Sequence, residues 1–135
     1  MAVTVAGGPP VSPEPAARAS YRRLEFPPYT LWEIRAGQGT AVALIHGLSG
    51  SSRWWSRNID ALSARHLVAA IDLVGFGRTR GSIRPLVLPP FGEVTALLAR
   101  WLESFGEPVH VIGHSMGGEL AIRLSAERMR HKLLP

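Results

Sequence analysis

Three short apolar runs constrain the fold more than any other feature of this sequence. They occupy residues 41–45, 67–71 and 109–112, and none of them alternates apolar with polar residues. A strand that is apolar at consecutive positions is buried on both faces, which is typical of a parallel sheet. Parallel strands are joined by crossover segments, so the intervals should hold helices. The sequence therefore predicts an α/β fold with an open, doubly wound, mostly parallel sheet.

Helical periodicity fills the intervals around these runs, because apolar residues recur there at spacings of three and four. The first predicted helix follows Ser51-Ser52, which we expect to cap it. The second is stopped by Gly106 and Pro108, and the third runs to about Met129. The apolar positions of the three helices are, in turn, Trp55, Ile59 and Leu62; Phe91, Val94, Leu98, Trp101 and Phe105; and Leu120, Ala121 and Leu124.

The remaining segments are interpreted as a hairpin strand, a leader and a loop. Residues 29–34 alternate in hydropathy and precede Gly37-Gln38-Gly39, which predicts a hairpin partner for the run at 41–45. The Pro- and Ala-rich residues 1–20 predict a flexible leader, which leaves residues 21–135 as the folded domain. The long segment from Val74 to Pro90 is expected to be a functional or flexible loop.

Composition excludes several classes of function. The net charge of +5 suggests nucleic acid as a partner, but the arginines are spread over different predicted elements and Lys132 is the only lysine. We therefore interpret the charge as a solvated surface and expect no nucleic-acid partner. The absence of cysteine excludes disulfides, thiolate metal sites and a cysteine nucleophile. No apolar run reaches membrane-spanning length, so we expect a cytoplasmic protein without a membrane span.

The motif Gly113-His114-Ser115-Met116-Gly117 lies between the third apolar run and the third predicted helix. A G-x-S-x-G sequence in that context forms a sharp strand-to-helix turn, which projects the serine oxygen from the top of the sheet. The flanking glycines Gly113 and Gly117 are needed because a Cβ there would collide with the neighbouring strand or helix. We therefore predict that Ser115 is a nucleophile and that the Met116 N–H stabilises an oxyanion.

Two further motifs follow the other apolar runs. His46-Gly47-Leu48 comes after the first run, where Gly47 lets the loop turn close to the serine and the Leu48 N–H is the second predicted oxyanion donor. Asp72-Leu73-Val74-Gly75-Phe76-Gly77 comes after the second run and predicts a tight loop beside the site. Since the carboxyl ends of parallel strands lie at one edge of a sheet, all three motifs should meet there.

Together these three motifs resemble the α/β-hydrolase superfamily in their order and spacing, over about residues 29–129. The resemblance implies a Ser nucleophile, an acyl-enzyme intermediate and a small-molecule ester, thioester or related acyl substrate, with no metal or organic cofactor. It also makes His46 and His114 motif residues of the oxyanion region rather than the general base. Val74 departs from the family, which often has proline there.

The triad of this family follows the chain order Ser, acid, His, and this sequence does not supply the last two. Only 20 residues follow Ser115, and the predicted helix takes them up. His131 would lie about 24 Å along that helix from Ser115, out of its reach. His66 and His110 are assigned structural roles. We therefore expect a truncated hydrolase domain that ends after the helix of the serine motif.

This truncation opens an alternative to an enzyme. If the sheet ends at residues 109–112, that strand has an unpaired edge, which invites pairing with a second copy or with a complementing chain. A non-catalytic remnant or interaction module is therefore the alternative function. A dinucleotide site is excluded because Gly75-Phe76-Gly77 lacks a third glycine at the required spacing. The aromatic residues Trp54, Trp55 and Phe76 are interpreted as core residues or as the lining of an apolar pocket.

Overall fold

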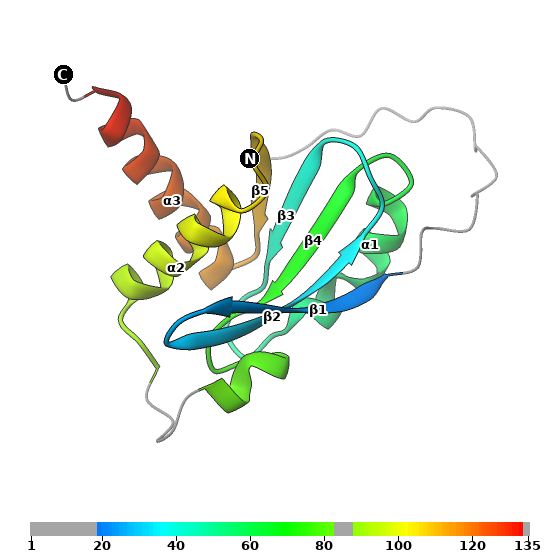
Figure 1. Ribbon diagram of the computed structural model, residues 1–135, viewed down its shortest axis with the longest axis horizontal. Coiled ribbons are helices and arrows are strands. Elements are labelled where there is room, and N and C mark those ends of the chain that lie inside the picture. Colours follow the sequence, from blue (N-terminus) through cyan, green and yellow to red (C-terminus); the bar gives the residue numbers. More distant parts are fainter. Residues whose placement is uncertain (1–18, 83–87, 134–135) are drawn as a thin grey trace.

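The computed structural model describes residues 19–82 and 88–133. They form a five-stranded sheet with the strand order β1-β2-β4-β3-β5, with helices on both faces (Figure 1). In chain order the elements are β1 (Ser20–Phe26), β2 (Tyr29–Ala36), β3 (Ala41–Ile45), the 3-10 helix η1 (Ser52–Trp55), α1 (Ser56–Leu62), β4 (Leu67–Asp72), the 3-10 helix η2 (Gly77–Ser82), α2 (Phe91–Glu103), β5 (Val109–Gly113) and α3 (Met116–Leu133).

The three apolar runs form the parallel part of the sheet, as the sequence predicted. β3 lies between β4 and β5 and pairs in parallel with both of them. Ile45, at the end of β3, is opposite Ile71 on one side and Gly113 on the other. Since these strands end at the same level, the loops that follow them emerge side by side at one edge of the sheet. This register brings the three sequence motifs together.

The hairpin prediction for residues 29–34 was wrong. β2 does not pair with β3; it pairs antiparallel with β1 on one side and with β4 on the other. Pro27 and Pro28 form the turn between β1 and β2, with Phe26 opposite Tyr29. The hairpin partner of β2 is therefore β1, the strand before it, and not β3. β1 begins at Ser20, the last residue of the predicted leader, and residues 1–18 of that leader lie outside the described residues.

The sheet separates two apolar layers. On one face, α2 and α3 cover a core that includes Ile45, Ile71, Leu98, Trp101 and Leu120. On the other face, α1 covers a smaller core. Figure 1 shows α2 and α3 next to each other and α1 apart from them. The smaller core under α1 consists of Ile34, Ala36, Val42, Leu44, Ile59, Val68 and Ala70, with Trp55, Leu62 and Ile112 at its margin.

The predicted cap of the first helix differs from the structure. Ser51 precedes η1, but its side chain makes no capping hydrogen bond. Instead, the Ser52 N–H donates to the Asp72 carboxylate at 2.7 Å. A helix N-terminus needs an acceptor for its free N–H groups, and here a residue from the end of β4 supplies it. This contact draws the loop after β3 towards the loop after β4.

A buried ion network joins the antiparallel hairpin to the rest of the fold. Glu33, on β2, is fully buried, and its Oε1 lies 2.8 Å from Arg35 Nε and 3.4 Å from an Arg22 nitrogen. The Trp101 indole N–H donates to Glu33 Oε2 at 2.8 Å. Because a buried carboxylate is costly unless it is paired and hydrogen-bonded, this network fixes α2 against β2.

Candidate active site

Ser115 occupies the turn between β5 and α3, in the left-handed region of backbone conformation at a φ of 54°. That region is unfavourable for a residue with a side chain, and such strain is often found at functional sites. Two hydrogen bonds close the turn: the Gly117 N–H donates to the His114 carbonyl at 2.9 Å, and the Gly118 N–H donates to the Ser115 carbonyl at 2.8 Å. The backbone therefore has the sharp strand-to-helix turn that the motif predicts.

Gly117 lets α3 approach the end of β3. A Cβ on Gly117 would lie 2.2 Å from the Ile45 carbonyl oxygen and 2.6 Å from that of His46. The His114 N–H also donates to the Ile45 carbonyl, at 3.0 Å. The turn that carries Ser115 is thus fastened to the strand from which the His46-Gly47-Leu48 loop begins.

That loop passes directly beside the serine. A Cβ on Gly47 would lie 3.2 Å from the Ser115 Cβ, so Gly47 and Ser115 are neighbours. The Leu48 and Met116 N–H groups, which flank this contact, have no hydrogen-bond partner among the described residues. Met116 is the first residue of α3, where free N–H groups and the helix dipole favour negative charge. These two N–H groups are the candidate donors to an oxyanion.

His46 has a structural position at the base of this loop. It is fully buried, its Nδ1 donates to the Gly47 carbonyl at 2.7 Å, and its Nε2 accepts from the Leu73 N–H at 3.0 Å. With Nε2 acting as an acceptor, the ring is the neutral Nδ1–H tautomer. Burial lowers the pKa of His46, although the Gly47 carbonyl and the Asp72 charge favour the protonated ring. Both nitrogens are occupied, so His46 is not available as a general base.

Asp72 fastens the adjacent loops. Its Oδ1 accepts the Ser52 N–H at 2.7 Å, and its Oδ2 accepts the Arg78 N–H at 3.0 Å. Gly77 has a positive φ of 53°, and a Cβ there would lie 2.4 Å from the Asp72 Cγ. The sequence predicted a tight loop after β4, and the carboxylate explains how it stays tight.

The other histidines do not supply a base in the described part of the chain. His114 is exposed and packs edge-to-face on Trp54, with a ring centroid distance of 6.0 Å. His110 is exposed on β5, and His66 lies at the start of β4, at the opposite end of the sheet from Ser115. His131 belongs to α3, about 24 Å along the helix from Ser115. Within the described ranges, His114, His110 and His66 make no hydrogen bond to Ser115.

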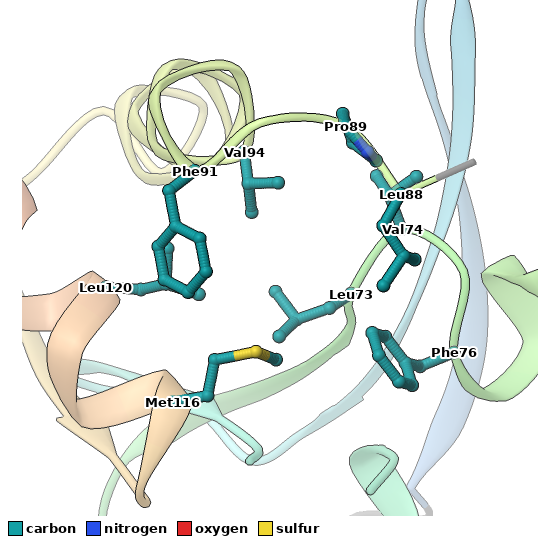
Figure 2. A pocket seen from close by; sticks show the side chains of 9 residues that line it. All are labelled: Leu73, Val74, Phe76, Leu88, Pro89, Phe91, Val94, Met116 and Leu120. Carbon is teal, nitrogen blue, oxygen red and sulfur yellow. The ribbon is translucent and has the colours of Figure 1, made fainter. Parts of the chain in front are cut away.

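An apolar cavity of about 70 Å³ lies next to Met116, whose side chain points into it (Figure 2). Phe76 lines the cavity, which agrees with the pocket alternative for that residue. Trp55 instead packs at the margin of the core under α1, and Trp54 is 55% exposed beside His114. The other residues that line the cavity were not predicted from the sequence to form a pocket. They are Leu73, Val74, Leu88, Pro89, Phe91, Val94 and Leu120.

In residues 19–82 and 88–133, no cluster of three or more His, Asp or Glu side chains has the arrangement of a metal site. None of the helices described is long and apolar enough to cross a membrane.

Comparisons with known proteins agree with this geometry. The sequence profile of the alpha/beta hydrolase family matches residues 42–134. The chain is 37% identical over 102 residues to a (lyso)-N-acylphosphatidylethanolamine lipase of Mus musculus, covering 70% of this chain and 29% of the lipase. Thus it spans less than a third of that relative's length.

Solved structures give the same result for the fold. The thioesterase domain from the curacin biosynthetic pathway matches with a TM-score of 0.76 and 25% identity, over 82% of this chain and 40% of that domain. An epoxide hydrolase from an endophytic Streptomyces matches with a TM-score of 0.68 and 26% identity, over 82% of this chain and 34% of the enzyme.

The fold and the turn at Ser115 define an α/β protein of the hydrolase type. The chain belongs to the alpha/beta hydrolase family.

Proposed function

We propose that this chain carries the nucleophile and the oxyanion donors of a serine hydrolase acting on esters, thioesters or related small acyl compounds. One observation carries the proposal: Ser115 is held at a φ of 54° against Gly47, between two N–H groups that lack partners in the described part of the chain. A structural turn would not need a strained serine beside two free donors. The acyl chemistry also suits the lipase and the thioesterase domain that the chain resembles.

In the proposed reaction the Ser115 oxygen forms a bond to the acyl carbon. The carbonyl oxygen becomes an oxyanion, which accepts hydrogen bonds from the N–H groups of Leu48 and Met116. When the oxyanion collapses, the bond to the alcohol or thiol breaks, and the leaving group takes up the proton that the serine released. Water then hydrolyses the Ser115 ester, releasing the acid. The described residues place no base at Ser115 to move these protons.

A fluorophosphonate probe tests the nucleophile. The Ser115 oxygen would displace fluoride from phosphorus and leave a stable phosphonyl ester, which peptide mass mapping locates. With no base at the serine, labelling should accelerate about tenfold per pH unit in alkaline solution, as hydroxide removes the proton. The label should be confined to Ser115 and absent from Ser115→Ala.

Ser125→Ala is the matched control for this experiment. Ser125 lies on the same helix, is exposed, and donates to the Ala121 carbonyl at 3.0 Å, so its loss should not change labelling. Labelling spread evenly over several serines, or none at Ser115 at high pH, would contradict the proposal.

A second candidate function is an interaction module, and the edge position of β5 favours it. β5 pairs only with β3 among the described strands. The His114 N–H points to β3, so by alternation along the strand the Val111 N–H and carbonyl point to the open edge. An unpaired apolar edge strand recruits another strand, and a second copy of the chain is the occupant we propose.

The oligomeric state tests this second candidate. Light scattering after size exclusion should show a dimer for the native chain and a monomer for Val111→Pro, which removes the outward N–H. Val111→Thr keeps that N–H and should remain dimeric. A native chain that stays monomeric at all concentrations up to the solubility limit would rule the module out.

A further inference from the structure

The cavity beside Met116 has apolar walls and is partly open to solvent. Leu73, Val74, Val94 and Leu120 contribute aliphatic walls, and the ring of Phe91 faces Met116 across the space (Figure 2). Among the described residues, no charged side chain lines it. A cavity of this kind favours an apolar group over water, because water finds no polar partner on its walls.

Met116 connects this cavity to the reaction. Its N–H is a candidate oxyanion donor, and its side chain forms part of the cavity wall. Since Met116 directly follows Ser115, an acyl carbon bonded to the serine would lie within a few bonds of the cavity.

The size of the cavity limits what it can take. An engineered apolar cavity of about 150 Å³ holds benzene, with six carbon atoms. By proportion, about 70 Å³ holds about three carbon atoms. A butyryl group has three carbons beyond its carbonyl carbon and fits this limit, whereas an octanoyl chain exceeds it.

We propose that this cavity is the acyl-chain pocket and that it selects short acyl groups of about butyryl length. The inference rests on the proposed function for its catalytic meaning, but the binding site itself can be tested without any reaction. Each methylene that leaves water contributes about fourfold in affinity. Butyramide, which has two more methylenes than acetamide, should therefore bind about fifteenfold more tightly, and octanamide no more tightly than butyramide.

Methyl NMR of the full chain measures this binding. The sequence has three methionines, and the Met116→Leu variant assigns the Met116 methyl signal in protein labelled with [methyl-13C]methionine. Butyramide should shift this signal saturably, and it should do so equally in Ser115→Ala. Val94→Phe adds a ring at a half-buried position of the cavity wall and should abolish the shift. Ala96→Phe places the same ring at an exposed position of α2 and should leave the shift unchanged.

A second experiment tests whether the cavity affects the reaction of Ser115. The chain is incubated at alkaline pH with p-nitrophenyl acetate, p-nitrophenyl butyrate or p-nitrophenyl octanoate, and mass spectrometry of the intact protein measures the rate of acylation. The butyrate ester should acylate Ser115 about fifteenfold faster than the acetate ester, and Val94→Phe should remove that preference. Butyramide binding without any acylation would disprove the proposed function and leave the pocket standing. Acylation without chain-length preference, together with no butyramide shift at Met116, would overturn the pocket.

Discussion

Gly47 and Ser115 lie so close that a Cβ on Gly47 would be 3.2 Å from the Cβ of Ser115 and 3.1 Å from both Nδ1 and the carbonyl oxygen of His114. The loop after β3 and the turn after β5 therefore touch without a side chain between them. The contact sets how close the Leu48 N–H lies to the serine, and it makes the position of the loop sensitive to a single methyl group.

Gly47→Ala should therefore slow Ser115 labelling much more than it lowers stability. The added methyl group forces the loop back by a few tenths of an ångström, and misplacement of an oxyanion donor costs about tenfold to a hundredfold in rate. Fluorophosphonate labelling and urea unfolding measure the two effects. Gly92→Ala is the matched control, because a Cβ there meets nothing within 4 Å. It should leave labelling unchanged and stabilise α2 by up to about 1 kcal/mol.

His46 should make stability fall in mild acid. Its pKa is lowered in the folded state by burial, so the unfolded chain takes up a proton first. The stability is therefore complete above about pH 6.5, the usual pKa of histidine, and declines as the pH falls towards the lower folded pKa. Urea unfolding at a series of pH values should show this decline in the native chain. His46→Gln should be less stable at neutral pH but should decline less in acid. Equal declines in both proteins would show that His46 is not the group responsible.

Glu33→Ala should destabilise the fold strongly. It leaves Arg35 and the Trp101 indole N–H without their buried partner, and breaking a buried pair costs about 3–5 kcal/mol. Glu119→Ala is the control, because it removes the exposed pair with Arg123 one turn away on α3. That change should cost no more than about 0.5 kcal/mol. Chemical unfolding of both variants measures the difference, and similar small losses would contradict the role given to Glu33.

Asp72→Asn should loosen the loops on either side of the site. An amide has one oxygen, so either the Ser52 N–H or the Arg78 N–H would then face an NH2 group. The loss of one buried acceptor costs about 1–3 kcal/mol. Hydrogen exchange should become faster at Ser52 and Arg78 before it does so in β4. Asp60→Asn, on the exposed side of α1, should change neither exchange nor stability.

The parallel core and the serine turn could be predicted from sequence because each rests on local information. A run such as residues 67–71 is apolar at successive positions wherever it is buried on both faces, and the structure has β4 there. The conformation of Ser115 depends on glycines within two residues of it. These signals need no knowledge of distant contacts.

The antiparallel end of the sheet could not be predicted in the same way. β1 carries Arg22, Arg23 and Glu25 and is largely exposed, so its apolar signal is weak. Glu33 looks like a surface residue in the sequence, because its partner Trp101 is 68 residues away. The walls of the cavity beside Met116 likewise come from loops and helices that only the tertiary fold brings together.

Asp72 holds its two neighbouring loops by their main-chain amides alone. The side chains of Ser52 and Arg78 take no part in these bonds, so a substitution at either position that fits the surrounding packing leaves the attachment intact. Side chains of the two loops can then differ between related proteins and change the substrate preference, while the Asp72 carboxylate keeps the loop backbones in place.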